Sequence, residues 1–314
     1  MSVTVPFGAP PLGAVLPGGN RRHFQHGPID LVVEAFGPGH EVGRAYKQAW
    51  ARFETVLGEL VGELPVLRAP LKARGPALKG ATARRMAAAC RLHGQVFVTP
   101  MAAVAGAVAD EVLAALVAGR TLEKAYVNDG GDIALHLTPG AAFDAGMVSL
   151  ATAPSAAGTI AIDHASPVRG IATSGWRGRS LSRGIADSVT VLARNAAEAD
   201  VAATLIANAV DADHPRIERV PARELDPDSD LGERAVTVAV GVLPDASVIE
   251  ALAAGAAAAE AMAADGRIVA AHLVLQGGTR TVGALAAALE DRTRPDRTVS
   301  RGAGPDQRRR AWTT

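Results

Sequence analysis

Several residue types that particular protein classes require are scarce in this sequence. A single cysteine among 314 residues, Cys90, excludes an intramolecular disulfide framework and any zinc or iron–sulfur site built from cysteines. Aromatic residues make up only 4% of the chain, which leaves few rings to stack on bases or sugars. Lys plus Arg and Asp plus Glu number 32 each, so no positive excess is available to neutralise phosphates. The composition therefore predicts a protein that does not bind nucleic acid.

Long apolar runs and common catalytic motifs are missing as well. The first 22 residues lack the basic start and continuous apolar stretch of a signal peptide, and no segment offers the roughly 20 uninterrupted bulky apolar residues of a membrane span. The sequence contains no Walker A, GxGxxG, GxSxG or HExxH motif, which disfavours P-loop enzymes, Rossmann dehydrogenases, α/β-hydrolases and zincins. Since 48% of the residues are hydrophobic, we expect a packed globular protein. Because the sequence shows neither a signal peptide nor a membrane span, we expect it to be cytoplasmic.

The apolar pattern predicts strand hairpins interrupted by long helices. Helical spacing of apolar residues and Ala-rich composition predict helices over 44–64, 101–117, 196–210 and 247–264. Short β-branched runs bounded by turn residues predict strands over 29–36, 187–193, 235–243 and 267–276, with a strand meander between 124 and 163. Because regular βαβ alternation is missing, we predict an α+β fold with antiparallel sheets flanked by helices. Two of the Ala-rich helices, 101–117 and 247–264, could pack either in the core or across a homodimer.

The same pattern indicates one folded unit with loose ends. Residues 1–20 are rich in Gly and Pro and predict a flexible arm, whereas residues 290–314 lose apolar periodicity and predict a disordered tail. The unit between them, 21–289, contains two weakly similar segments that each run from a Val-Thr pair into a small-residue helix with one Asp. This similarity hints at an internal duplication, with halves 21–125 and 126–289.

The sequence VNDGGDI offers the first candidate site. Gly130 and Gly131 allow a tight turn and a close approach of the backbone to a ligand, and Asn128, Asp129 and Asp132 add oxygen acceptors around it. The alternative is an ordinary turn closed by side-chain hydrogen bonds.

A second candidate site lies between residues 171 and 193. Small residues, hydroxyls and guanidinium groups are combined there in a way that suits a phosphate or carboxylate ligand, and the set comprises Thr173, Ser174, Gly175, Arg177, Arg179, Ser182 and Arg183. The alternative is a surface loop with solvated arginines.

Two further patterns involve metal-ligating residue types. Asp200 and Thr204 are four residues apart on a predicted helix and so share one face, which suits Mg²⁺, although such pairs are also common on solvated helices. His23, His26 and Asp30 invite a metal or anion site. In an extended segment, however, residues three apart point to opposite faces, so structural packing of the histidines is the alternative.

Taken in order, these motifs resemble the ApbE family of Mg²⁺-dependent flavin transferases. In that family an NAGGD turn, an ATSG segment, an SVTV strand and an ADxxAT helix follow one another. Here they appear as Asn128–Asp132, Ala172–Gly175, Ser188–Val191 and Ala199–Thr204. The N-terminal segments HFQHGPIDL and FVTPMAAVAGAVADE resemble an uncharacterised (UPF) branch of ApbE-like proteins.

The resemblance implies an α+β fold with a central cleft for FAD or FMN. Asp200 and Thr204 would correspond to metal ligands, and the 128–132 turn would supply a backbone carbonyl, with Asp129 as an added carboxylate where the family has alanine. The implied reaction cleaves the FAD pyrophosphate and passes FMN to a Thr hydroxyl of an acceptor protein, with Mg²⁺ neutralising phosphoryl charge. Asn128, Gly130, Gly131, Asp132 and the 173–182 segment would contact the cofactor, while His23, His26 and Arg183 are candidates for a substrate anion.

One departure from the family keeps other functions open. The family's HxIxDPxTG stretch is absent, and residues 179–187 read RSLSRGIAD instead, without a histidine or a proline. The leading hypothesis is a transferase with a Mg²⁺-dependent cleft for an anionic small molecule. The alternatives are an enzyme of another class acting on a small anionic metabolite, such as a heterocyclic carboxylate, and a non-catalytic flavin or nucleotide binder.

Overall fold

A nine-stranded antiparallel sheet forms the centre of the protein. We analysed a computed structural model that describes residues 9–72, 77–149 and 155–283. The strand order in the sheet is β1-β2-β3-β4-β5-β8-β9-β12-β13. The strands are β1 (Leu12–Val15), β2 (Arg22–His26), β3 (Ile29–Phe36), β4 (Lys124–Asp129), β5 (Asp132–Leu137), β8 (Gly170–Ser174), β9 (Ser188–Ala193), β12 (Ala270–Leu275) and β13 (Gly278–Gly283). The predicted α+β class with antiparallel sheets is therefore confirmed.

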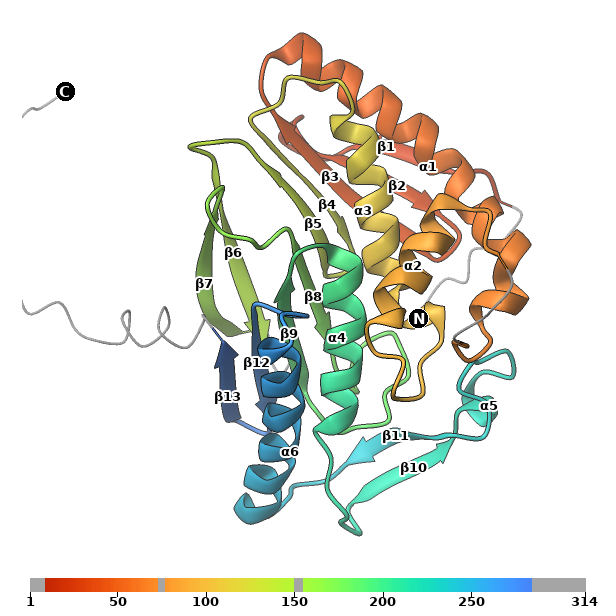
Figure 1. Ribbon diagram of the computed structural model, residues 1–314, viewed down its shortest axis with the longest axis vertical. Helices are drawn as coiled ribbons and strands as arrows, with labels where there is room; N and C mark the ends of the chain where they lie inside the picture. Colours follow the sequence, from red (N-terminus) through yellow and green to blue (C-terminus); the bar gives the residue numbers. More distant parts are fainter. Residues whose placement is uncertain (1–8, 73–76, 150–154, 284–314) are drawn as a thin grey trace, which may run out of the picture.

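Helices cover one face of this sheet (Figure 1). Neighbouring helices pack in the order α1, α3, α4, α6, with α2 beside α1 and α3. Their bounds are α1 (Gly39–Leu67), α2 (Ala81–Arg91), α3 (Val104–Val117), α4 (Ala196–Ala209) and α6 (Asp245–Ala264), with a 3-10 turn at Pro100–Ala103 and a short α5 (Ala222–Leu225). In β3, the buried residues Ile29, Leu31 and Val33 alternate with partly exposed ones. Because successive strand residues face opposite ways, these three side chains all point toward the helices.

The opposite face of the sheet is partly covered by a hairpin. Strands β6 (Ala142–Ser149) and β7 (Ser155–Asp163) pair with each other in a separate two-stranded sheet. Their Phe143 and Ile162 pack in one apolar cluster with Leu135, Ile171 and Leu192 of the main sheet. A further two-stranded sheet, β10 (Ile217–Pro221) with β11 (Ala235–Val240), lies near the lower end of α4 and α6 in Figure 1.

The two halves of the sheet repeat one topology. Hairpin β2–β3 is followed by helices and hairpin β4–β5, and hairpin β8–β9 is followed by helices and hairpin β12–β13. The repeat therefore changes over between β5 and β8, whereas the boundary predicted at 125/126 falls inside strand β4. Only Ile133 with Ile171 and Ala134 with Gly170 pair across this junction, which makes it a narrow connection between the halves.

The central helices α3 and α4 cap each other reciprocally. The Asp110 carboxylate of α3 accepts hydrogen bonds from the amides of Ala196 and Ala197 at the start of α4, at 3.1 and 2.9 Å. The Asp200 carboxylate of α4 accepts one from the amide of Gly106 at the start of α3, at 3.0 Å. Each Asp lies in its half's similar segment and satisfies amide donors that a helix start leaves unpaired. This exchange agrees with the internal duplication suggested by the sequence.

Several local predictions need correction. Leu12–Val15, expected in a flexible arm, form β1 because their backbone pairs with β2. Pro65, expected to end the first helix, lies inside the last turn of α1, which ends two residues later at Leu67. Strand β13 was not predicted, and the predicted tail 290–314 lies outside the described residues.

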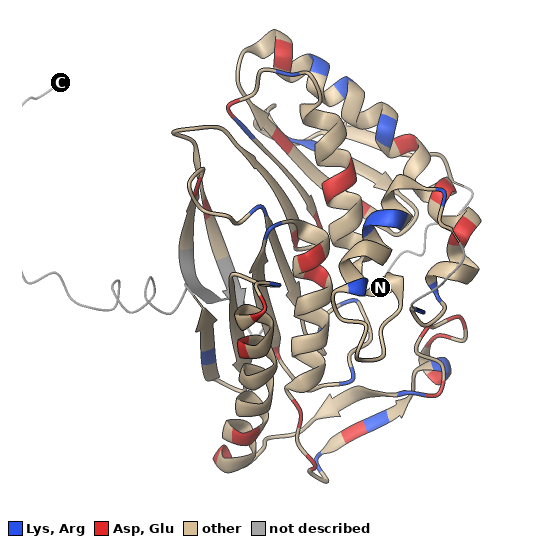
Figure 2. Ribbon diagram, in the orientation of Figure 1, with Lys and Arg blue, Asp and Glu red and all other residues tan. Residues whose placement is uncertain are grey.

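Two helices are long and apolar enough to cross a membrane by length and composition alone. They are Pro100–Val117 and Asp245–Ala264. In the described structure α3 packs against α1, α4, β4 and β5, and α6 packs against α4, β12 and β13. Both helices therefore supply the core that covers the sheet. Charged residues of both signs are interspersed around this core (Figure 2).

Candidate functional site

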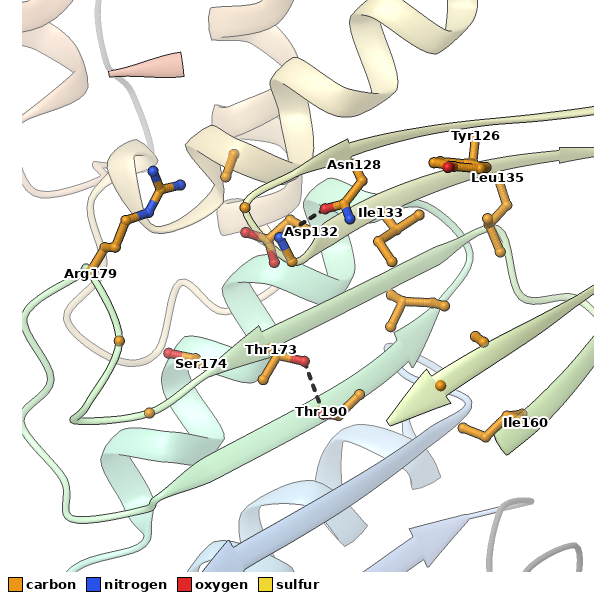
Figure 3. Close-up of a pocket in the computed structure, with 18 of the residues that line it drawn as sticks. Tyr126, Asn128, Asp132, Ile133, Leu135, Ile160, Thr173, Ser174, Arg179 and Thr190 are labelled. Atoms are coloured by element: carbon orange, nitrogen blue, oxygen red, sulfur yellow. Dashed lines mark hydrogen bonds between the residues drawn. The ribbon is translucent and has the colours of Figure 1, made fainter. Parts of the chain in front are cut away.

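A cavity of about 840 Å³ lies where the two halves of the sheet meet. Its walls come from β4, β5, β8 and β9, from the β6–β7 hairpin, and from the loop 174–180 that follows β8 (Figure 3). The strands face it with the side of the sheet that the helices leave uncovered. The predicted cleft therefore exists, and the narrow β5–β8 junction forms part of its floor.

One end of the cavity is apolar. Tyr126 and Phe143 meet edge to face with their ring centroids 5.8 Å apart. The aliphatic residues around them are Ile133, Leu135, Ile160 and Ile171. Such a surface suits the planar, weakly polar part of a ligand.

The predicted glycine turn forms the other end. Gly130 and Gly131 have φ angles of 63° and 119°, in the left-handed region that favours glycine. Asn128 Oδ1 accepts a hydrogen bond from the Gly131 amide at 2.8 Å, so the turn is closed by a side chain as the alternative interpretation expected. The turn nevertheless also lines the cavity. The Arg179 guanidinium packs against Gly130, in the place that a Cβ atom at this position would take.

The arginine loop after β8 supplies positive charge to this end. Arg177 Nε donates to the buried Asp187 at 3.3 Å, and its guanidinium lies over the Trp176 ring at 4.6 Å. Thr173 and Thr190 form a hydroxyl pair at 2.9 Å on the adjacent strands. The predicted residues that line the cavity are Asn128, Gly130, Gly131, Asp132, Thr173, Ser174, Gly175, Arg177 and Arg179.

Two buried carboxyl groups, Asp129 and Asp132, flank the glycine turn, and the charge of Asp200 on α4 acts on Asp132. Burial raises the pKa of Asp129 to about 7, although the Asp30 amide and the Arg179 charge oppose the shift. Burial also raises the pKa of Asp132 well above its usual value, and the charges of Asp200 and Asp129 add to that shift. Burial likewise raises the pKa of Asp200 to about 7. The charges of Asp129 and Asp200 thus disfavour ionisation of Asp132.

These carboxyl oxygens fit a hard divalent cation. Mg²⁺ prefers oxygen ligands and usually takes one or two protein carboxylates, keeping waters in its other positions. Within the described ranges, no group of three or more His, Cys, Asp or Glu side chains is arranged to hold a metal. Asp132, Asp129 and Asp200 supply the oxygen donors that Mg²⁺ prefers, and a site here would use one or two of them rather than all three.

Thr204 lies on α4 one helical turn beyond Asp200. It lines a second cavity, of about 40 Å³, together with Arg183 and Asn208, and neither it nor Asp200 lines the large cavity. Ser182 is also absent from the cavity lining, because it is buried with its hydroxyl directed at the Gly184 carbonyl and Asn208.

The two N-terminal histidines lie apart. His23 is on the sheet face opposite the helices, with Nε2 2.7 Å from Asp30 Oδ1. His26 has a ring centroid 6.2 Å from that of Phe53 of α1, so it faces the core. The two side chains therefore point to opposite faces of the sheet, since three steps along a strand reverse the direction of the side chain.

Sequence reasoning missed the apolar wall and some supporting residues. Tyr126 shares the cavity-facing side of β4 with Asn128, so strand alternation from the predicted turn could have identified it. Asp187, which holds Arg177, and Phe143 of the hairpin carried no local signal because their partners come from other elements.

These features define an α+β protein in which a cavity lies between an antiparallel sheet, whose two halves share one topology, and an added hairpin. The family model described as AbpE bacteria matches residues 13–281, and the chain belongs to this ApbE-like family. A UPF0280 protein of Methanothrix thermoacetophila is 36% identical over 129 residues, which are 40% of this chain; the chain thus spans about half (51%) of that relative's length.

Solved structures with a similar arrangement include two flavin transferases. The apo form of the flavinyl transferase ApbE of Pseudomonas stutzeri is 14% identical with a TM-score of 0.47, over 88% of this chain and 95% of that one. A mutant of the flavin transferase ApbE from Vibrio cholerae is 12% identical with a TM-score of 0.42, over 89% and 99%.

Proposed function

We propose that this protein binds FAD with Mg²⁺ and cleaves its pyrophosphate, transferring FMN to an acceptor hydroxyl. The observation that carries the proposal is the two-ended cavity, with an aromatic and aliphatic wall at one end and two guanidinium groups beside a glycine turn at the other. A ligand with a flat ring system and an internal pyrophosphate matches both ends. Membership of the ApbE-like family supports the same reaction class.

Each end of the cavity has a separate task in this proposal. Tyr126 and Phe143 contact the flavin ring, while Arg177 and Arg179 bind the phosphates. Asp187 fixes the Arg177 Nε and so leaves the two terminal nitrogens of its guanidinium to donate to an anion. One or two of the carboxylates of Asp132, Asp129 and Asp200 would hold Mg²⁺, which would neutralise charge on the phosphoryl group and on the leaving nucleotide.

Ligand-induced thermal stabilisation and AMP release test the proposal together. We expect FAD to raise the melting temperature of the wild type only when Mg²⁺ is present, and AMP to appear in the same mixture. Asp200→Asn should abolish the Mg²⁺-dependent part of the stabilisation. Arg177→Gln should weaken FAD binding about tenfold, on the order of a lost charge-assisted hydrogen bond, whereas the exposed Arg44→Gln should not.

The alternatives predict different outcomes of this experiment. Stabilisation by FAD without AMP release, with and without a Thr-containing peptide, would identify a flavin or nucleotide binder instead. Stabilisation by small heteroaromatic carboxylates but not by FAD would identify an enzyme of another class. An undiminished Mg²⁺ response in Asp200→Asn would remove Asp200 from the metal site.

A further inference from the structure

A histidine and an aspartate form a pair beside the polar end of the cavity. His23 of β2 and Asp30 of β3 are joined by the 2.7 Å contact between Nε2 and Oδ1. Their side chains are 31% and 45% exposed, so solvent and a second substrate can reach them. Neither residue lines the cavity, and the proposed function leaves the pair without a role.

The strand register places this pair next to the anion-binding end. Leu31 pairs with Asp129 across β3 and β4, so Asp30, one residue earlier, lies beside Gly130. The guanidinium of Arg179 packs against the same Gly130. The pair therefore borders the phosphate-binding groups from the β3 side of the turn.

The contact with Asp30 determines which nitrogen of His23 can accept a proton. An ionised carboxylate accepts hydrogen bonds and cannot donate, so a neutral His23 carries its hydrogen on Nε2 and donates it to Asp30. The lone pair of Nδ1 is then available, and the Asp30 charge stabilises the imidazolium formed when Nδ1 takes up a proton. This is the chemistry of a general base oriented by a carboxylate.

Other histidines around the sheet are less suited to this task. His26 faces the core beside Phe53. His272 is cross-strand partner to Thr190, which lines the cavity, but it is only 9% exposed and its Nδ1 is bonded to the Thr281 hydroxyl at 2.9 Å. An incoming acceptor can thus reach His23 far more easily than either of these side chains.

Few charges other than Asp30 face His23. Its partner residue on the edge strand β1 is Ala14, which has no charge. Arg21 and Glu34 are other charged residues near this part of the sheet, and both act on Tyr126.

We propose that His23 is the general base of the transfer step, positioned by Asp30; the inference rests on the function proposed above. The proton of the acceptor hydroxyl passes to His23 Nδ1, and the hydroxyl oxygen forms a bond to the FMN-side phosphorus. The phosphorus–oxygen bond of the pyrophosphate breaks, and AMP leaves with its electron pair. With water as the acceptor, the products are FMN and AMP.

The test measures AMP release from FAD with Mg²⁺ and, separately, FAD binding by the quenching of flavin fluorescence. We expect His23→Gln to lower kcat about 100-fold, a typical general-base contribution, with unchanged FAD affinity and KM. It should also abolish the fall in kcat at acidic pH that protonation of an imidazole causes. Asp30→Asn should lower kcat about tenfold, and the control His40→Gln, whose side chain is 72% exposed, should have no effect.

The possible failures are distinguishable. Wild-type kcat and an unchanged pH profile in His23→Gln would overturn the role of His23 alone. A loss of FAD binding in that variant, equal to its loss of rate, would assign His23 to binding and overturn its role as a base. Absence of AMP release by the wild type would overturn the proposed function and this inference together.

Discussion

The two faces of the nine-stranded sheet differ in what fills the space above them. On the helix-covered face, small and aliphatic residues of α1, α3, α4 and α6 fill the space. There the Asp110 and Asp200 carboxylates also accept hydrogen bonds from backbone amides at the starts of α4 and α3. On the other face the β6–β7 hairpin covers the apolar strands only in part, and a cavity remains beside the arginine loop. We therefore expect folding stability to depend mainly on the helix-covered face and binding of the proposed ligand mainly on the other, and substitutions should separate them.

The largest expected effect lies where α3 and α4 touch. A Cβ atom at Gly106 would collide with the Ala196 carbonyl, and backbone atoms cannot move aside easily. Gly106→Ala should therefore lower the free energy of unfolding by about 3 kcal/mol, the upper range for overpacking, in urea denaturation. The control Gly58→Ala, in open space on α1, should raise it by up to about 1 kcal/mol. Equal effects of the two variants would contradict the close contact.

A smaller effect should appear in the pH dependence of stability. Burial raises the pKa of Asp110 in the folded protein to about 6, above the ordinary 3.8. Between pH 4 and 6 the folded state holds this proton more often than the unfolded state does, so stability falls as pH rises across that range. Asp110→Asn removes this group, and the stability of the wild type relative to the variant should fall by about 2 kcal/mol from pH 4 to pH 7.

Urea denaturation in metal-free buffer at each pH measures this difference. The exposed Asp213→Asn serves as the control and should follow the wild type at every pH. If the wild type instead became more stable relative to Asp110→Asn as the pH rises, the folded state would favour the charged form of Asp110.

The smallest effect on stability is expected at the cavity. Arg179 is exposed and makes no hydrogen bond to another described residue, so Arg179→Gln should change the free energy of unfolding by less than about 0.5 kcal/mol. The same substitution should weaken FAD binding about tenfold, measured by fluorescence quenching at fixed Mg²⁺. Unfolding of this variant, or unchanged FAD affinity, would remove the proposed separation of the two faces.

Much of the site's chemistry was visible in the sequence because it is local. Gly130 and Gly131 are adjacent residues, and Arg177 and Arg179 lie two residues apart on one loop, so each motif could be recognised without its surroundings. Spacing on a helix predicted that Asp200 and Thr204 share a face, but it could not show that Thr204 lines a separate small cavity. The hairpin residue Phe143 could not be assigned to the site, since nothing in its segment identifies the strand it covers.

The sequence by itself determined the class of fold, the glycine turn and the arginine loop, because periodicity, backbone freedom and charge act over a few neighbouring residues. The tertiary structure alone decided that Asp30 lies beside Gly130, that Asp110 and Asp200 exchange helix caps, and that a hairpin encloses the cavity. These contacts join residues that are about 90 to 100 positions apart in the chain or come from separate elements. Their positions follow from strand register and helix packing, which depend on the whole core rather than on any one segment.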